Sequence, residues 1–126
     1  LSNKIPSGNR VAGVVNAGFE STYGADELIN LKQAAVSEET IEKLNVINTF
    51  GLVDTHSPFL DVTPMADDER YADVVECLLK DDNVDCVFVA IVPHSVAVRT
   101  DPESCDSEGS LANRLSALSR KYKKQI

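Results

Sequence analysis

The chain has 126 residues, 43% of them hydrophobic, and carries a formal net charge of −8 at pH 7. This length is typical of a single domain with its own hydrophobic core. The acidic balance argues against a nucleic-acid-binding surface, which needs clustered lysine and arginine, and the apolar runs fall well short of the roughly 18 residues of a membrane span.

The first residues lack the apolar core of a secretory signal. We therefore interpret residues 1–9 as a linker and residues 10–126 as the domain. The three cysteines have no CxxC spacing, which favours reduced thiols and a cytoplasmic setting; they are Cys77, Cys86 and Cys105. His56 and His94 are isolated from each other and from any close pair of thiols, so no metal site is expected.

The segment Arg10–Leu31 is the most informative part of the sequence. An apolar run stops at Asn16-Ala17-Gly18, and this pattern predicts a buried strand followed by a tight turn. An amphipathic helix is expected to follow at once, carrying Ala25, Leu28, Ile29 and Leu31. The N-terminus of that helix would present free N–H groups and the positive end of its dipole, which suits an anion such as phosphate.

Further elements follow in alternation. Ser37 is a predicted N-cap with acidic residues behind it, and short strands are possible at residues 52–53 and 59–62. A helix opening near Asp67 has the strongest periodic signal, with an inward stripe of Tyr71, Val74, Val75, Leu78 and Leu79. It is expected to end at residues 81–83.

The apolar run Cys86–Val92 predicts a strand that is covered on both faces. Pro93–Gly109 is a long polar loop, and such loops are functional or mobile. A last helix is expected over about Ser110–Lys124, with an inward stripe of Leu111, Leu115, Leu118 and Tyr122.

Strands that alternate with helices predict an α/β domain with a mostly parallel sheet. The chain ends after a helix, where this fold would return to another strand, so we expect the C-terminal strand to be missing. Apolar surface left uncovered in this way favours a homodimer.

Two turns are candidate ligand sites. Asn16-Ala17-Gly18 and Pro93-His94-Ser95 each follow a predicted strand, and open α/β sheets bind ligands at the carboxyl ends of their strands. Both also have plain structural interpretations. Gly18 would permit a turn, including one with positive φ, while Pro93 would stop the strand and leave His94 in a solvated loop.

The sequence gives little evidence for other catalytic or ligand-binding sites. Asp54 and Asp61 could lie near the same edge of the sheet, but both also suit turns or helix caps, and for Asp54 we favour a turn. No Ser/His/Asp or Cys/His arrangement is recognisable, because the neighbours His56 and Ser57 would diverge on an extended chain. Neither GxxxxGK[ST] nor GxGxxG occurs, so neither of these nucleotide-binding loops is present.

The ordered series RVAGVVNAGF, SEET, SPFLDVT, ERY and DDNVD, followed by an apolar strand that ends in Pro93, resembles the NDP-forming acyl-CoA synthetases (acetate–CoA ligase, ADP-forming). The resemblance covers about residues 8–93. It is to the last flavodoxin-like domain of that family, which is similar to the C-terminal domain of the succinyl-CoA synthetase beta subunit. A flavodoxin-like three-layer fold is therefore implied.

This resemblance implies a parent enzyme that interconverts carboxylate, CoA and ATP with acyl-CoA, ADP and phosphate, using Mg. In the family a phosphohistidine carries the phosphoryl group, and it lies in a different domain in a small-residue context. Neither His56 nor His94 has that context, so neither is assigned this role. The implied partners are the CoA-binding, phosphohistidine and ATP-grasp domains, and the fragment alone is expected to be inactive.

By the same resemblance, the NAG turn would help to hold the phosphorylated loop, through Asn16, Ala17 and Gly18, and the later turn would do so through Pro93, His94 and Ser95. The chain departs from the family at both places, with Phe19 for a second glycine and Pro93-His94 for a glycine pair of the succinyl branch. These departures favour an alternative, a non-catalytic interaction or regulatory domain of the same ancestry. A free-standing mononucleotide binder is a further alternative, against which the absence of an aromatic or Ser/Thr-rich phosphate loop speaks.

Overall fold

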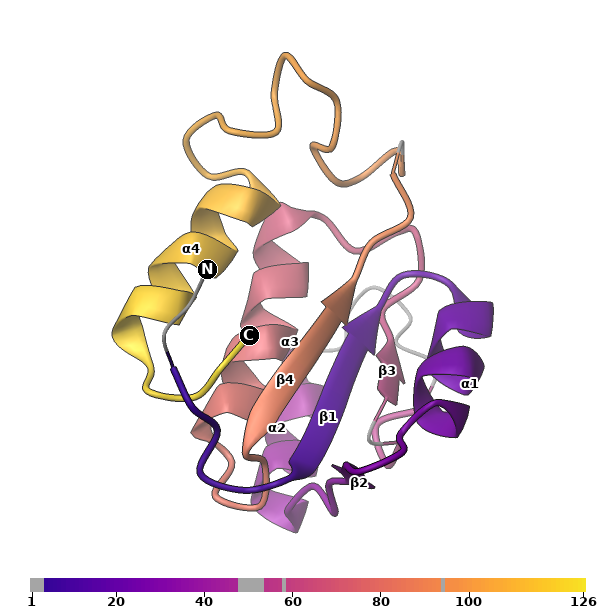
Figure 1. Ribbon diagram of the computed structural model, residues 1–126. Helices are drawn as coiled ribbons and strands as arrows, with labels where there is room; N and C mark the ends of the chain where they lie inside the picture. The colour runs from indigo at the N-terminus through magenta and orange to yellow at the C-terminus, as the bar shows by residue number, and fades with distance from the viewer. Residues whose placement is uncertain (1–3, 48–53, 58, 94) are drawn as a thin grey trace.

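A computed structural model describes residues 4–47, 54–57, 59–93 and 95–126. Strands and helices alternate along the chain (Figure 1). They are β1 (Arg10–Val15), α1 (Gly18–Asp26), β2 (Lys32–Gln33), α2 (Glu38–Ile47), β3 (Phe59–Asp61), α3 (Asp68–Lys80), β4 (Cys86–Ala90) and α4 (Leu111–Lys121). Among the described residues, no helix is both long and apolar enough to cross a membrane.

β1 is the central strand of a four-stranded sheet in which every pairing is parallel. β4 pairs along one edge of β1, from Val11 to Val15. The other edge is shared: β2 pairs with the start of β1, and β3 pairs with its end. The parallel sheet predicted from the alternation of strands and helices is therefore confirmed.

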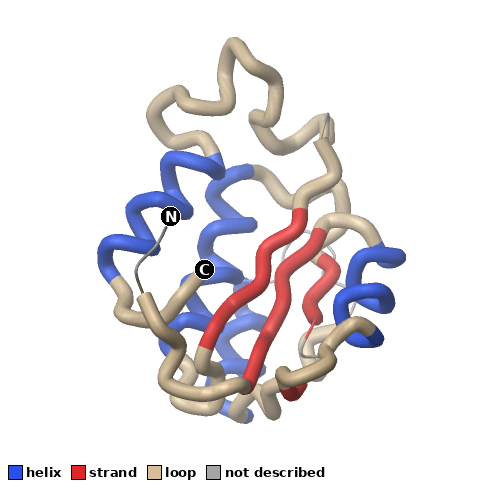
Figure 2. The backbone as a smooth tube through the Cα atoms, in the orientation of Figure 1, coloured by secondary structure: helices blue, strands red, loops and turns tan. Residues whose placement is uncertain are grey.

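The sheet lies between two unequal layers of helices, as Figures 1 and 2 show. α3 packs on β1 and β4 and is flanked by α2 and α4, whereas α1 packs against β1 and β3 on the other face. The main core fills the space on the α3 side, where the predicted stripe of α3 is fully buried. This three-layer arrangement confirms the expected α/β flavodoxin-like fold.

Three of the four helices begin where local sequence signals predict. The Ser37 hydroxyl accepts from the Thr40 N–H at 3.3 Å, and Asp67 accepts from the Arg70 N–H at 2.9 Å. Ser110 accepts from the Asn113 N–H in the same way at 3.3 Å. Each of these side chains satisfies a backbone donor that the first turn of a helix leaves unpaired.

The helix expected to carry Leu28, Ile29 and Leu31 is shorter than predicted, since α1 ends at Asp26. None of its residues is buried, so there is no apolar stripe to extend it. The chain instead turns and forms β2, a two-residue strand that the sequence analysis missed. The possible strand at residues 52–53 lies outside the described residues.

The prediction that β4 is covered on both faces is wrong. Val87 faces the main core and is 3% exposed, whereas its neighbour Phe88 is 46% exposed. The reason is that α1 leans toward β3 and leaves the same face of β4 open. The strand is also shorter than the apolar run, ending at Ala90.

Two sets of contacts stabilise the amino end of the sheet. The Asp85 carboxylate accepts from the backbone N–H and the guanidinium of Arg10, at 2.8 to 2.9 Å. The chain after α4 returns to this end, where Gln125 forms a parallel bridge with Cys86 and accepts from the Val87 N–H at 2.9 Å.

The long loop after β4 is tied to the starts of α3 and α4 by one buried carboxylate. Asp68 Oδ1 accepts from the Leu111 N–H at 2.8 Å and the Arg99 N–H at 3.2 Å, and Oδ2 accepts from Arg99 Nε at 2.7 Å. The Arg99 guanidinium also donates to the Ser107 hydroxyl and the Glu108 carbonyl, both at 3.2 Å. Asp68 therefore joins the loop to the first turns of both helices.

A second carboxylate, on the outer side of α3, makes stability depend on pH. Lys121 and Tyr122 each donate to Glu76 at 2.7 Å, and these bonds lower the Glu76 pKa to about 2. Because the folded pKa is below the unfolded value, this stabilisation is present above about pH 5 and is lost as the pH falls toward 2. We expect Glu76→Gln to cost about 1 kcal/mol at pH 7 and almost nothing at pH 2.5.

Urea unfolding of both proteins at the two pH values measures this. Glu42→Gln, on the exposed side of α2, is the matched control. If Glu76→Gln lowers the free energy of unfolding equally at both pH values, Glu76 does not cause the pH dependence of stability.

Candidate functional site

The turn after β1 and the segment after β4 meet at the carboxyl end of the sheet. Asn16, which is 1% exposed, joins them, since its Oδ1 accepts from the Val92 N–H at 2.8 Å. Its Nδ2 is buried without a hydrogen-bond partner among the described residues. The two predicted turns are thus brought together through Asn16 and the residue that precedes Pro93.

The second turn contributes less than the first. Pro93 is exposed, and the Ser95 hydroxyl donates to the Pro64 carbonyl at 3.2 Å, which draws this residue toward the loop between β3 and α3. His94 lies outside the described residues.

The first turn opens the N-terminus of α1 without a side-chain cap. Ala17 is the N-cap residue, with extended backbone angles, and has no side-chain oxygen to pair with the first N–H groups. Gly18 is the first helical residue, and a Cβ there would lie 3.3 Å from Asp61 Oδ2. The expectation that Gly18 has a positive φ is wrong, because Gly109 is the described glycine with that conformation. Glycine at position 18 instead allows Asp61 to approach closely.

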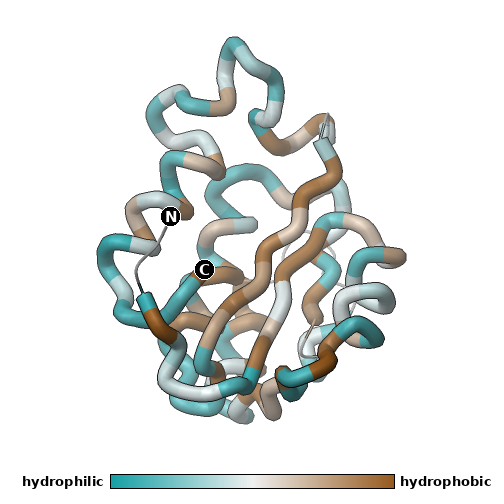
Figure 3. The backbone as a smooth tube through the Cα atoms, viewed as in Figure 1, coloured by the Kyte–Doolittle hydropathy of each residue, from teal (hydrophilic) through white to brown (hydrophobic). Residues whose placement is uncertain are grey.

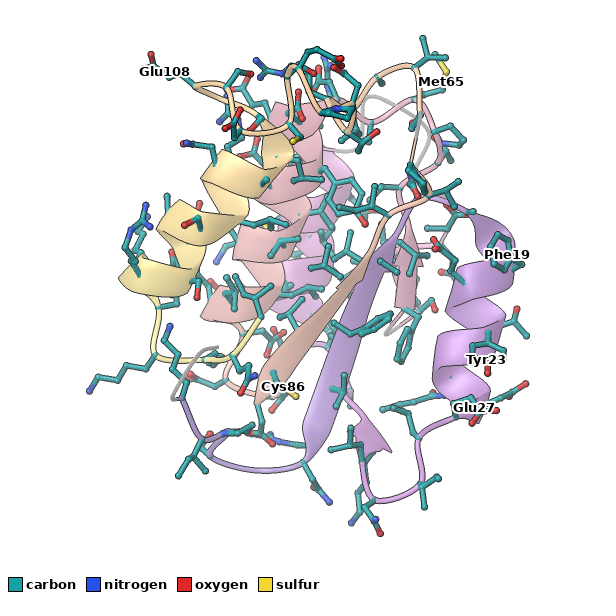
Figure 4. The ribbon with its side chains drawn as sticks, turned by 45° about the horizontal axis from the view of Figure 1, so that its top comes forward. Phe19, Tyr23, Glu27, Met65, Cys86 and Glu108 are labelled. Carbon is teal, nitrogen blue, oxygen red and sulfur yellow. The ribbon has the colours of Figure 1, made fainter. Side chains whose placement is uncertain are left out.

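Phe19, at the place of the expected second glycine, does not fill the turn. Its side chain is 70% exposed and points outward from α1, on the same side as Tyr23 (Figure 4). The Phe19 ring therefore does not close the turn.

A residue that the sequence analysis did not single out occupies the turn. The Glu20 carboxylate lies near the backbone N–H groups of Asn16 and Ala17. Burial raises the Glu20 pKa, the two N–H groups lower it, and the nearby charge of Asp61 raises it. Its Oε2 atom is buried without a hydrogen-bond partner among the described residues.

A signal for this contact exists in the sequence. Glu20 stands three residues after the N-cap, the spacing at which glutamate reaches back to the N-cap N–H in a capping box. The signal is incomplete because Ala17 replaces the serine or threonine of that pattern.

The buried Tyr71 side chain contacts the ends of the two strands that precede the turns. The Tyr71 hydroxyl donates to the carbonyls of Val14 at 2.8 Å and Ala90 at 2.7 Å, and so ties the ends of β1 and β4 to α3. Burial, followed by the charges of Glu20 and Asp61, raises the Tyr71 pKa far above its ordinary value. The hydroxyl is therefore a fixed neutral donor. Periodicity predicted Tyr71 as a core residue but could not show this role.

The two aspartates considered in the sequence both form local turns. Asp61 Oδ1 accepts from the Thr63 N–H at 2.8 Å, and Asp54 Oδ1 accepts from the His56 N–H at 2.9 Å. The turn favoured for Asp54 is confirmed. In the described part of the chain, no three His, Cys, Asp or Glu side chains gather in a way that could hold a metal ion.

A separate apolar groove of about 530 Å³ lies on the open face of the sheet, between α1 and β4. Figure 3 shows the hydrophobic runs of β1 and β4. Glu27 is the charged residue among its described lining. The others are Pro6, Val11, Tyr23, Gly24, Leu28, Leu31, Phe59, Cys86, Val87, Phe88, Gln125 and Ile126.

Comparison with known proteins identifies a relative of the chain. No protein-family model matches the chain. The chain is, however, 34% identical over 108 residues to the "Acetate--CoA ligase [ADP-forming] II subunit alpha" of Pyrococcus furiosus, a match that covers 84% of the chain. The chain is homologous to a domain of the NDP-forming acyl-CoA synthetases. It spans 23% of the length of this curated relative.

Solved structures agree with the fold. PH0766 from Pyrococcus horikoshii OT3 matches 97% of the chain with 25% identity and a TM-score of 0.66, and the chain covers 32% of that protein. The dinucleotide forming acetyl-coenzyme A synthetase 1 of Ca. Korarchaeum cryptofilum, in its apo form, matches 98% of the chain at 20% identity and a TM-score of 0.62; the chain covers 31% of it. Like the acetate–CoA ligase subunit of P. furiosus, both of these proteins are much longer than this chain.

Proposed function

We propose that the chain is a domain of an NDP-forming acyl-CoA synthetase that interconverts carboxylate, CoA and ATP with acyl-CoA, ADP and phosphate. The observation that carries the proposal is the identity with the ADP-forming acetate–CoA ligase subunit over most of the chain. The phosphohistidine, CoA, ATP/ADP and Mg of such a reaction belong to other domains or subunits, which are the partners of this one.

In this proposal the domain presents the carboxyl end of its sheet to the phosphoryl group. Asn16, Ala17 and Gly18 form the N-terminus of α1 there, and an oxyanion is stabilised by the N–H groups and dipole of a helix N-terminus. Pro93, His94 and Ser95 belong to the neighbouring segment, which Asn16 holds through the Val92 N–H.

The test is the activity of the full-length gene product with a panel of short carboxylates, CoA, ATP and Mg²⁺. Formation of acyl-CoA together with ADP supports the proposal. A folded full-length protein that makes neither product with any carboxylate counts against it.

The 126-residue chain by itself is expected to show no acyl-CoA formation, because it carries neither the phosphohistidine context nor a nucleotide-binding loop. The same assay on the purified chain measures this. Thioester formation from acetate, CoA and ATP would show that the chemistry has been assigned to the wrong domains.

One observation favours the alternative, a non-catalytic interaction or regulatory domain of the same ancestry. The Glu20 carboxylate lies near the N–H groups of Asn16 and Ala17, and its charge would oppose a phosphoryl group bound there. A full-length protein that binds CoA or nucleotide without turnover would support this alternative.

The open sheet face is proposed as the surface that another domain of the parent protein covers. Phe88 and Tyr23, at 46% and 68% exposure, are large side chains that a single domain seldom leaves open next to an apolar groove. We therefore expect the isolated chain to form dimers at high concentration, and Phe88→Glu to weaken the dimer by at least about tenfold.

Light scattering of the wild type and of Phe88→Glu measures this, with Val46→Glu on the exposed side of α2 as the control. A strict monomer at high concentration, or equal association of all three proteins, would contradict the expectation.

A further inference from the structure

Two arginine side chains converge beside Gly109, which lies just before α4. A Cβ at this glycine would be 3.3 Å from Arg99 Nη2 and 3.8 Å from Arg114 Nη2, and apart from the chain neighbours of Gly109 no other described residue has an atom within 4 Å of that point. Arg99 has a side chain that is 41% exposed, and Arg114 is half-buried. Because Gly109 has no side chain, the space between the two guanidinium groups is open to a ligand.

Both guanidinium groups are held in place through their other nitrogen atoms. Arg99 Nε donates to Asp68 Oδ2 at 2.7 Å, and Arg99 Nη1 donates to the Ser107 hydroxyl at 3.2 Å. Arg114 Nε donates to the Gly109 carbonyl at 2.9 Å. Among the described residues, neither Nη2 atom has a hydrogen-bond partner. Two charged donors are therefore fixed in position and have no acceptor.

The positive charge at this point is only partly balanced. Asp68 forms an ion pair with Arg99, whereas Arg114 forms no ion pair within the described part of the chain. The N-terminus of α4 adds the positive end of a helix dipole on the same side. Since like charges that lie close together repel each other, an anion shared by the two arginines would relieve this repulsion.

We propose that the guanidinium groups of Arg99 and Arg114 form a binding site for a phosphoryl group, with Nη2 of each arginine donating to a different oxygen. Guanidinium groups match the geometry of phosphoryl oxygens, and two of them balance a double negative charge that a carboxylate does not have. The same loop carries Asp101, Asp106 and Glu108, so a ligand that engages only one arginine gains little from the electrostatics of this region.

This site is separate from the turn after β1. In Figure 4, Glu108, the neighbour of Gly109, and Phe19, the neighbour of Gly18, lie on opposite sides of the molecule. The inference therefore goes beyond the proposed function and does not depend on it.

The experiment is a titration of the 126-residue chain with inorganic phosphate at pH 7 and constant ionic strength. NMR follows the Gly109 amide signal and the Nε–H signals of the arginine side chains. Methyl phosphate and acetate are titrated in parallel. Arg114→Gln removes one of the two cations without touching the bonds of Arg99 to Asp68.

Arg120→Gln is the matched control, because it removes the same charge from an exposed position of α4. Thermal unfolding of both variants verifies that they are folded.

We expect phosphate to shift the Gly109 amide and the Nε–H signals of Arg99 and Arg114, and to bind about tenfold more tightly than acetate. Arg114→Gln should weaken phosphate binding about tenfold, the scale of one charge-assisted hydrogen bond, and Arg120→Gln should match the wild type. Methyl phosphate that binds as tightly as phosphate would identify an esterified phosphoryl group as the ligand, and weaker binding would identify free phosphate.

Equal affinity of the wild type and Arg114→Gln for phosphate would overturn the proposal. An equal loss in Arg120→Gln would overturn it too, because binding would then follow the net charge of the chain. Acetate that binds as tightly as phosphate would contradict a phosphoryl ligand, and shifts confined to residues 16–18 would place the anion at the turn after β1 instead. None of these results bears on the family relationship or on the activity of the full-length protein.

Discussion

Gly18→Glu is expected to lower acyl-CoA formation by the full-length protein by about 10²–10³-fold, the loss that follows removal of one preorganised anion-stabilising donor. The new side chain would start 3.3 Å from Asp61 Oδ2 and add a third carboxylate beside Asp61 and Glu20. Unlike the Glu20 side chain, the new side chain would extend from the first residue of α1. Steady-state rates of acyl-CoA formation measure the effect.

Gly18→Ala is the matched control. Position 18 has no positive φ, so alanine adds no backbone strain, and its Cβ requires Asp61 to move by only a few tenths of an ångström. We expect this variant to keep most of its activity. If Gly18→Glu folds and turns over at the wild-type rate, the turn is structural and does not face the phosphoryl group.

Asp68→Ala is expected to have the largest effect on stability, a loss of about 3 kcal/mol. The change removes three hydrogen bonds at once and leaves the Leu111 N–H buried without its acceptor. It also removes a negative charge from the first turn of α3 and from the start of α4, where that charge favours both helices. Urea unfolding of wild type and variant measures the loss.

Two variants separate the effect of the Asp68 hydrogen bonds on stability from the effect of its charge. Asp68→Asn keeps one acceptor and should lose about half as much, while Arg99→Ala should mainly free the loop before α4. If Asp68→Ala unfolds at the wild-type urea concentration, Asp68 is not the point that holds this loop.

The parts of the fold that could be predicted are those set by neighbours in the sequence. The N-caps at Ser37, Asp67 and Ser110 and the buried stripe of α3 depend on residues three or four positions apart, so the sequence contains the whole signal. The position of the NAG turn at the end of β1 has the same origin, since an apolar run followed by small residues is a local pattern.

The parts that were missed depend on contacts across the fold. Ile29 and Phe88 look like buried residues in the sequence, but α1 ends at Asp26 and lies against β3, so it covers neither of them. The bonds from Asp68 to Arg99 and Leu111 join residues 31 and 43 positions apart, which no local pattern shows. For the site, Glu20 was missed because half of its capping pattern is replaced by Ala17.

The most direct test of a synthetase domain does not need the acyl substrate. The full-length gene product is incubated with ATP labelled in the γ-phosphate and Mg²⁺, and the protein-bound label is measured before and after addition of ADP. We expect an acid-labile phosphoryl group on the protein that ADP removes to regenerate ATP. A folded full-length protein that binds ATP and takes up no label would contradict it.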